Sequence, residues 1–407
     1  MTKAGRELSH QSPTAPQARV GSLDALRGLA LFGVLAVNLE TEFRVSIFQQ
    51  FVSGPPERAV DRWIDAILLT FVDMKAFALF SLLFGIGLAI QFERLVSTPR
   101  RAALLVRRLL VLLGLGLIHL VLIWNGDILT EYAVAGLIVL PFLFGRAWLP
   151  ALGCALFLGL YLVQPFLPPL VTFPSRTWLL HYVAAADRVY STGGFLEILR
   201  FRVEETAGIL PLHAFVLPRT LGLFLLGVVA WRSGLVQRAG NRQRTLGSAA
   251  FLATGAGTAL TLATATRNYS GWPSLGWVQT VAAPVGTILL ALGYAIAVLA
   301  TGSTLSGRRR LAWAEPVGRM AFTNYVVQSL VLGLIFYGYG LGLLGKLSLA
   351  EGFGLVLAVY FTQVYGSHLW LRRYRFGPLE WLWRTLMYGQ VPSGSLRSRD
   401  CAISNDC

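Results

Sequence analysis

The chain has 407 residues, of which 55% are hydrophobic and only 14% are charged, and its net charge is +15 at pH 7. A soluble protein carries about 25% charged residues, so this composition excludes a soluble globular protein and indicates one that crosses a membrane several times. Nucleic-acid binding is excluded too, because no long basic domain is present to carry it.

Ten apolar segments follow one another along the chain, and each is long enough to cross a bilayer core of roughly 30 Å. They are Leu23–Leu39, Asp73–Phe92, Leu104–Ile123, Ile128–Phe144, Trp148–Leu167, Ile209–Trp231, Thr245–Thr264, Trp277–Thr301, Gly318–Leu341 and Gly352–Leu371. The sequence therefore predicts an all-α protein, a polytopic transmembrane bundle of about ten helices over residues 21–388. Arg58–Thr70 has mixed polarity and fits either an interfacial helix or an extension of the second span. Residues 1–20 and 389–407 are predicted to be disordered tails.

The charged loops predict the orientation of the bundle, because Lys and Arg are enriched in cytoplasmic loops. The basic segments are Arg94–Arg108, Arg232–Arg244, Arg308–Arg319 and Arg372–Arg384. All of them fall on one side of the membrane when the N-terminus is cytoplasmic. Both termini are therefore predicted to be cytoplasmic, and the long connection 171–206 to lie outside. We expect a multi-pass protein of the cell (plasma) membrane.

Polar side chains interrupt these apolar segments, where such groups are costly and mark sites or pathways. Asn38, Lys75, His119 and Asp127 fall at one level, near the outer ends of four consecutive spans, and Glu131 follows Asp127 by about one helical turn. Several helices thus each donate one polar group at a similar depth. This arrangement predicts a buried polar cavity.

A second polar group lies toward the cytoplasmic side. Asp24 and Arg27 begin the first span, and Arg319 begins the ninth. Guanidinium groups bind phosphate well, so these three residues are candidates for binding a cytoplasmic donor. We expect Asp24 and Arg27 to pair across helices with Arg319 or Glu380.

The ninth span adds further candidates for contact with a substrate. Asn324 and Gln328 are four residues apart and share one helix face, and Tyr325 is next to them. With Lys75 and Glu131 they form the predicted substrate-binding set.

Each predicted site residue also has a simpler structural explanation. Asp24 fits a helix cap, and Arg27 fits a cation that extends to the membrane surface. Asn38 fits a hydrogen bond between helices, His119 a core histidine, and Asp127 the cap of the fourth helix. Both interpretations stay open at this point.

The chemistry that these residues offer suits acyl transfer. A histidine such as His119 is the usual general base near neutral pH, and Asp127 would orient it. The amide of Asn38 would donate to a developing oxyanion. No GxSxG, Walker A, HExxH or dinucleotide pattern indicates another enzyme class. No metal or bound cofactor is expected, and acyl-CoA would be a co-substrate.

Five stretches of the chain occur together in a characteristic order and spacing. They are LDALRGLALFGVLAVN (Leu23–Asn38), KAFALFSLLFGIG (Lys75–Gly87), GLIHLVLIWNGDIL (Gly116–Leu129), GRMAFTNYVVQ (Gly318–Gln328) and GPLEWLWR (Gly377–Arg384). In combination they resemble the YeiB-like family of bacterial multi-pass membrane proteins, over nearly the whole chain after the N-terminal tail. This resemblance implies the fold but no defined reaction.

The opening LDALRG pattern is also similar to the start of the transmembrane acyltransferase superfamily. That resemblance implies transfer of an acyl group from cytoplasmic acyl-CoA to an acceptor on the far side, as in enzymes that acylate surface sugars. In the lysosomal heparan-glucosaminide acetyltransferase pattern, an Asn at the end of the first helix is followed shortly by the active-site His. Asn38 matches that Asn, but no histidine lies between Asn38 and His119. Either His119 takes the role from another helix, or the chemistry differs.

Three functions therefore stay open. The first is a membrane acyltransferase with a sugar, lipid or small-metabolite acceptor, the second a transporter or flippase, and the third a non-catalytic membrane partner. The expected partners are the lipid bilayer, acyl-CoA and the acceptor, and a homodimer is left open. Trp178 and His181 in the outer connection are placed near an acceptor site by their position alone.

Overall fold

The structure is a computed structural model that describes residues 21–168, 172–265, 276–389 and 391. Its helices are α2 (Gly21–Asn38), α3 (Ala59–Phe71), α4 (Lys75–Arg94), α5 (Arg101–Ile118), α6 (Ile128–Phe144), α7 (Leu149–Val163), α8 (Arg176–Thr192), α9 (Phe195–Arg232), α10 (Gln243–Ala265), α12 (Gly276–Gly302), α13 (Leu305–Leu311), α14 (Glu315–Arg319), α15 (Ala321–Phe336), α16 (Leu349–Arg373) and α17 (Pro378–Tyr388). Two π-helical turns, η2 (Leu39–Phe43) and η4 (His119–Ile123), extend α2 and α5. Short 3-10 turns cover Gln49–Phe51, Gln164–Phe166 and Ala239–Arg242. The predicted tail 1–20, and all but two residues of the predicted tail 389–407, lie outside the described residues.

The predicted all-α class is confirmed for the described ranges, in which every regular element is a helix. Eight helical stretches of this part of the chain are long and apolar enough to cross a membrane. Helices α6 and α15 are apolar but shorter, with 17 and 16 residues. All ten predicted spans fall on helices, and α6 begins and ends at the predicted residues.

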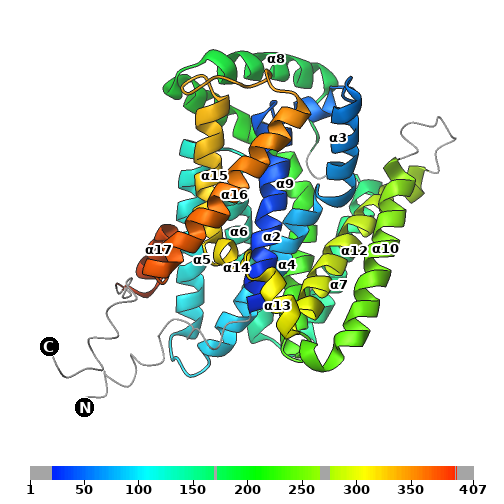
Figure 1. Ribbon diagram of the computed structural model, residues 1–407, viewed down its shortest axis with the longest axis vertical. Helices are drawn as coiled ribbons and strands as arrows, with labels where there is room; N and C mark the ends of the chain where they lie inside the picture. The colour runs from blue at the N-terminus through cyan, green and yellow to red at the C-terminus, as the bar shows by residue number, and fades with distance from the viewer. Residues whose placement is uncertain (1–20, 169–171, 266–275, 390, 392–407) are drawn as a thin grey trace.

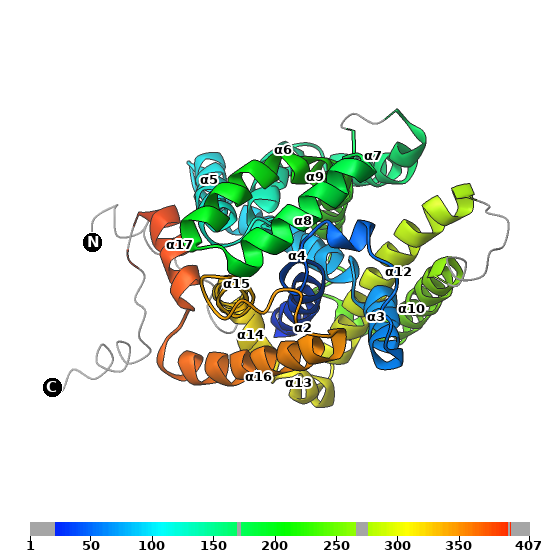
Figure 2. The same ribbon diagram turned by 90° about the horizontal axis from the view of Figure 1, so that it is seen from above.

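Helix α2 forms the centre of the bundle, as Figure 2 shows from above. In its most apolar window 78% of the residues are buried, compared with 22% for α5 together with η4. Helices α4, α9, α12, α14, α15 and α16 surround it or pack close by. A helix that is buried on all sides is the natural carrier of polar groups that must be shielded from lipid.

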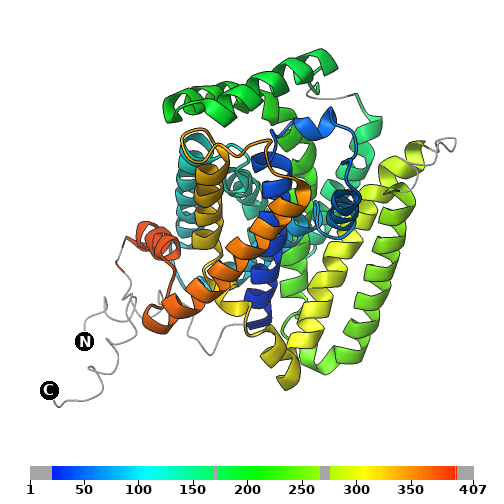
Figure 3. The same ribbon diagram turned by 45° about the horizontal axis from the view of Figure 1, so that its top comes forward.

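The two ends of the bundle differ in character (Figure 1). Helix α8 and the beginning of α9 lie across the top, as Figure 3 also shows. The basic connections before α5 and after α9, together with α13 and α17, lie toward the opposite end. We call these the α8 end and the basic end. The predicted separation of charge along the chain is thus a separation in space.

The connection 171–206, predicted only as a loop, contains helix α8 and the first turns of α9. Ser175 caps α8 by accepting the Trp178 N–H at 3.2 Å. The buried residues of α8 recur at helical spacing and are Leu179, Tyr182, Ala186, Val189 and Tyr190. This spacing makes α8 an amphipathic helix that packs on the bundle with one face. Helix α9 begins at Phe195, earlier than the predicted span at Ile209.

The predicted ninth span is shorter than expected. Arg319 ends the short helix α14, and α15 runs only from Ala321 to Phe336. Beyond its end, the Gly338 N–H donates to the Tyr190 carbonyl at 2.7 Å. The chain therefore leaves the helix to bond to α8.

The mixed segment Arg58–Thr70 forms α3, a helix separate from α4. The break is at Met74, whose φ of 58° lies in the left-handed region that is rare for a side-chain-bearing residue. Just after the break, the Lys75 Nζ donates to the Leu69 carbonyl at 2.6 Å. A buried lysine thus satisfies backbone at the end of α3.

Small residues allow α4 and α9 to pack closely. A Cβ atom on Gly85 of α4 would lie 2.0 Å from the Phe224 carbonyl oxygen of α9, and one on Gly227 would lie 2.3 Å from the Leu82 carbonyl oxygen. Both distances are far below contact, so only glycine allows this approach.

We predict that Gly85→Ala lowers the free energy of unfolding by about 1–3 kcal/mol, the usual cost of forcing a methyl group into a packed interface. Gly87→Ala on the same helix is the matched control, because nothing lies within 4 Å of its added Cβ. Thermal unfolding of both variants in detergent measures the difference. Equal stability of the two variants would contradict the close α4–α9 approach.

Candidate functional site

A cavity of about 640 Å³ lies among α2, α4, α5, α15 and α17. Its volume is within the roughly 300–1,000 Å³ usual for small-molecule sites. From charged residues at the basic end it reaches Ile128, Leu129, Tyr132 and Tyr325. Ile128 and Leu129 begin α6, so the cavity extends through much of the bundle toward the α8 end.

Basic side chains predominate where the cavity meets the basic end. Five arginines and three acidic residues line it: Arg27, Arg94, Arg108, Arg319, Arg384, Asp24, Glu93 and Glu380. Aromatic rings support two of these cations, since Arg108 lies 4.6 Å over the Trp383 ring and Arg384 lies 4.6 Å over the Phe376 ring. The three residues predicted to bind a donor all line this single cavity.

Asp24 and Arg27 pair with each other rather than across helices. Arg27 Nη1 lies 2.5 Å from Asp24 Oδ1, because residues three apart are neighbours on a helix. Glu380 instead accepts the Thr323 N–H at 3.1 Å and its hydroxyl at 2.5 Å, at the start of α15. Burial raises the pKa of Glu380, and the hydrogen bonds from Thr323 oppose that rise. The predicted pairing with Arg319 or Glu380 is therefore wrong.

His119 and Asp127 form a fully buried pair. His119 Nδ1 lies 2.9 Å from Asp127 Oδ1. Asp127 also caps α6, because its carboxylate accepts the N–H groups of Leu129 at 3.1 Å and Thr130 at 2.7 Å. The prediction that Asp127 caps the fourth helix is thus confirmed, and the same carboxylate also contacts His119. Both ring nitrogens of His119 are buried without a hydrogen bond among the residues that the structure describes, so Nδ1 lies within contact distance of Asp127 Oδ1 but not in hydrogen-bonding geometry.

Two helices change to π-helical turns at or next to two of the three residues predicted as catalytic, Asn38 and His119. The turn η2 follows α2 directly after Asn38, and η4 begins at His119. Isolated π-turns within helices are frequent at functional sites, since they rotate side chains away from the regular spacing. The Asn38 Oδ1 is buried and has no hydrogen-bond partner in the described part of the chain. No hydrogen bond joins Asn38 to His119 there either.

Tyr325 connects the cavity to the His119–Asp127 pair. Its ring lines the cavity and lies 5.1 Å from the His119 ring, centroid to centroid. Its hydroxyl oxygen accepts the Ile128 N–H at 3.3 Å. The deep end of the cavity is thus separated from His119 by about one aromatic ring.

Asn324 and Gln328 face α16 rather than the cavity. The Asn324 side chain donates to Ser367 Oγ at 2.9 Å, and the Gln328 side chain donates to Gln363 Oε1 at 2.7 Å. They share one face, as predicted, and that face joins α15 to α16. This contact fixes the rotation of α15 and with it the direction of Tyr325.

Glu131 faces α9, and Lys75 lies at the start of α4. Glu131 accepts the Thr220 hydroxyl at 2.6 Å, and its Oε2 lies 2.9 Å from His213 Nδ1. Neither Lys75 nor Glu131 lines the cavity among the described residues. His213 was not predicted to have a role, although it is one of only five histidines in the chain.

A buried polar cluster near the α8 end was also missed. Glu205 of α9 accepts hydrogen bonds from Asn125 and Tyr190, and Arg202 donates to the Leu122 carbonyl at 3.2 Å. The signal was present, since Arg202 and Glu205 are three residues apart on one helix face. Both residues were missed because they fall within the connection 171–206, which was predicted as a loop.

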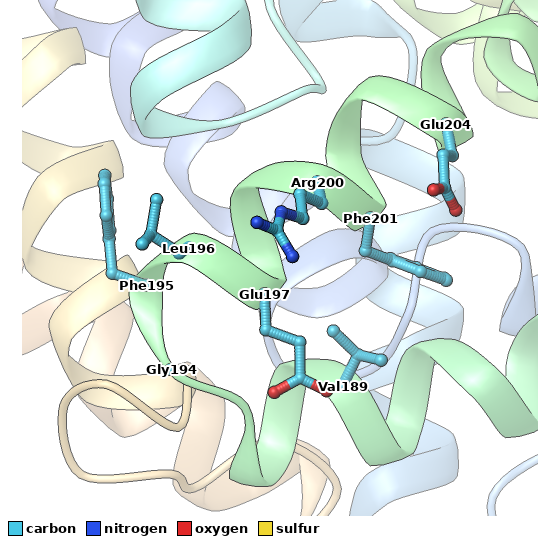
Figure 4. Close-up of a pocket in the computed structure, with 8 residues that line it drawn as sticks. All are labelled: Val189, Gly194, Phe195, Leu196, Glu197, Arg200, Phe201 and Glu204. Atoms are coloured by element: carbon cyan, nitrogen blue, oxygen red, sulfur yellow. The ribbon is translucent and has the colours of Figure 1, made fainter.

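A shallow hollow of about 750 Å³ lies on the surface where α8 meets α9 (Figure 4). It is lined by Val189, Gly194, Phe195, Leu196, Glu197, Arg200, Phe201 and Glu204. The Tyr182 ring stacks against Phe201 at 5.7 Å and against Trp178 at 5.0 Å, centroid to centroid. Trp178 therefore supports the α8–α9 junction, while His181 is exposed, and neither is among the described residues that line the hollow.

Apolar spanning helices around a cavity with a basic mouth define the class of a multi-pass helical membrane protein. The chain belongs to the YeiB-like family. It is 30% identical to the uncharacterized protein YeiB of Escherichia coli (strain K12), over 90% of this chain and 95% of that protein. It is 34% identical to the uncharacterized protein YxaH of Bacillus subtilis (strain 168), over 94% of this chain and 97% of that protein. It is also 29% identical to an uncharacterized 39.9 kDa protein in the amylase 3′ region of Bacillus acidopullulyticus, over 93% and 96%. Residues 230–390 match the family model described as a protein of unknown function, DUF418.

Asp127 can be tested as a cap apart from its contact with His119. Asp127→Ala removes the acceptor for two backbone N–H groups, so we expect a loss of about 1 kcal/mol in the free energy of unfolding. Asp127→Asn keeps a good capping residue and should lose distinctly less. Chemical unfolding in detergent measures both. An equal loss in the two variants would show that the carboxylate stabilises the fold through His119 instead.

Proposed function

We propose that the protein is a membrane acyltransferase that takes an acyl group from cytoplasmic acyl-CoA and passes it to a sugar, lipid or small-metabolite acceptor. The observation that carries this proposal is the cavity that begins among five arginines and ends at Tyr325, against the buried His119–Asp127 pair. A phosphate-rich donor would bind at such a mouth, and a general base stands at the other end.

The proposal includes the topology. Ten helices cross the membrane, the short α6 and α15 among them, and the basic end faces the cytoplasm by the positive-inside rule. Both termini are then cytoplasmic, and α8 lies on the outer surface of the plasma membrane. The cavity mouth thereby opens on the side where acyl-CoA is found.

The donor would lie along the cavity. Arg27 and Arg319 bind the phosphates of CoA, because guanidinium groups present paired donors to phosphate oxygens. Asp24 holds Arg27 in place through their ion pair. The pantetheine arm follows the apolar wall, and the thioester reaches Tyr325.

The transfer then follows acid–base chemistry. His119, oriented by Asp127, takes the proton of the acceptor X–H, and X attacks the thioester carbonyl. The Asn38 amide would stabilise the oxyanion. Collapse of the tetrahedral intermediate forms the acyl–X bond, breaks the C–S bond and releases the CoA thiolate, which regains a proton as CoA–SH.

A transporter or flippase is the second candidate, and one observation favours it. The described helices α4 and α9 carry several buried ionisable groups, including Lys75, Glu205 and Arg219, as proton-coupled pathways do. A transporter releases its substrate unchanged, whereas an acyltransferase splits acyl-CoA. The fate of an isotopic label on the acetyl group therefore separates the two.

Acetyl-CoA binding to the purified protein tests the donor site. We expect calorimetry to show binding that weakens about tenfold in Arg27→Ala and in Arg319→Ala, since a lost charge-assisted contact costs about 1.5–3 kcal/mol. Arg309→Ala is the matched control, because Arg309 is an exposed cation of α13. No binding, or equal loss in all three variants, would refute a specific site in the cavity.

The catalytic roles are tested by release of free thiol from acetyl-CoA, with a bacterial membrane extract as the source of acceptor. We expect His119→Gln to reduce the rate by about 10²–10⁴-fold, the usual contribution of a general base, and Asn38→Ala by about 10²–10³-fold. Acetyl-CoA binding should be unchanged in both variants. Full activity in either variant would remove that residue from the mechanism.

A further inference from the structure

A line of titratable side chains leads away from the buried His119. His119 Nδ1 lies 2.9 Å from Asp127 Oδ1, and on the next turn of α6 Glu131 Oε2 lies 2.9 Å from His213 Nδ1 of α9. Asp127 is the N-cap of α6, and Glu131 follows four residues later on the first turn of the helix. Two histidine–carboxylate pairs are thus placed in series by one helix.

Exposure increases along this line. The side chains of His119 and Asp127 are 2% and 0% exposed, that of Glu131 is 10% exposed and that of His213 is 32% exposed. His213 also lies near the α8 end, because the neighbouring Phe215 carbonyl accepts the side chain of Gln164 at the end of α7, at 2.6 Å. The line therefore begins in the sealed interior and ends at a partly exposed histidine toward the α8 end.

Other charged groups surround the second pair without interrupting it. Asp73 and Lys75 at the start of α4 interact electrostatically with Arg219 of α9, and Arg219 lies 5.9 Å from the ring of Tyr161 on α7. Asp73 and Lys75 carry opposite charges and Arg219 adds a further positive charge, while the carboxylate of Glu131 contacts the Thr220 hydroxyl and His213. On α6, Tyr132 is the remaining titratable neighbour of Glu131.

We propose that Asp127, Glu131 and His213 form a proton path that connects His119 with the water at the α8 end. Each member accepts a proton on one atom and passes on another, and one water molecule spans the gap between the Asp127 and Glu131 carboxylates. Glu131 and His213 act through His119, so they are positioning residues for proton transfer and do not touch the reacting groups.

The path deepens the proposed function, on which it rests for the role of His119. His119 takes one proton from the acceptor X–H as the acyl–X bond forms and the C–S bond breaks. That proton leaves through Asp127, Glu131 and His213 to the outer water, and the CoA thiolate takes one proton from the cytoplasmic water. Atoms and charges balance, and His119 returns to its neutral form for the next cycle.

Exchange of the His119 ring proton with water tests the path without any acyl-CoA. The full chain is labelled with 15N-histidine in lipid nanodiscs, and the resonances are assigned with single His→Gln variants. We expect Glu131→Gln to slow the exchange of His119 about tenfold or more, in keeping with the contribution of a positioned proton-transfer group. His213→Gln should slow it similarly, and it provides a second test if Glu131→Gln does not fold.

Thr220→Val is the matched control. It removes the other hydrogen bond of Glu131 and so weakens the contact between α6 and α9, but it leaves the path complete. Unchanged exchange of His119 in this control, with slowed exchange in the two path variants, supports the proposal. Wild-type exchange in Glu131→Gln and His213→Gln, or equal slowing in Thr220→Val, would show that Glu131 merely joins helices. Failure of acetyl-CoA binding would instead overturn the donor site and leave this measurement intact.

Discussion

The carboxylate of Asp127 joins the end of one helix to the beginning of the next. It caps α6 through two backbone N–H groups and contacts His119, the residue at which α5 passes into a π-turn. A charge without such partners would be too costly to bury. The hydrogen bonds of the cap therefore allow Asp127 to stay buried beside His119, and the position of the ring follows from the position of the helix start.

Helix α2 imposes the second constraint. Because it is enclosed by other helices, it can carry Asp24 and Arg27 at one end and Asn38 at the other without exposing them to lipid. The close approach of α14 secures the basic end, since a Cβ on Gly318 would lie 1.8 Å from the Asp24 carbonyl oxygen. The polar groups of α2 thus depend on backbone contacts that only small residues permit.

Hydropathy predicted the helices well because each span is a local pattern. The bounds of α6 were predicted to the residue, and the three donor-site candidates do line one cavity. The direction of a side chain depends on helix rotation, which sequence spacing does not report. Asn324 and Gln328 therefore face α16 instead of the cavity, whereas the adjacent Tyr325 lines it. The roles in acyl transfer stay predictions, because no contact with a donor or acceptor bears on them.

Amphipathic elements were the main weakness of the sequence reading. Helix α8 has too little apolar character to resemble a span, and its buried face becomes evident only when the bundle beneath it is known. Arg202 and Glu205 were missed because they lie on the first turns of α9, in the same connection that was predicted as a loop. Both side chains are buried. A search for helical periodicity within the polar connection, in addition to hydropathy, would have found both.

The aromatic layer between the two polar regions explains how such a bundle stays sealed. Phe43 stacks on Trp124 at 4.9 Å, and Tyr337 lies 5.6 Å from Phe43. His119 lies at the edge of this layer, at 6.3 Å from the Trp124 ring and 5.1 Å from the Tyr325 ring. The cavity from the basic end stops at Tyr325, and the Glu205 cluster lies toward the α8 end. In the proposed mechanism, His119 would accept a proton beside this layer without a continuous water-filled channel through the bundle. A general base buried in this way would need a separate route for its proton, which is the role proposed for Glu131 and His213.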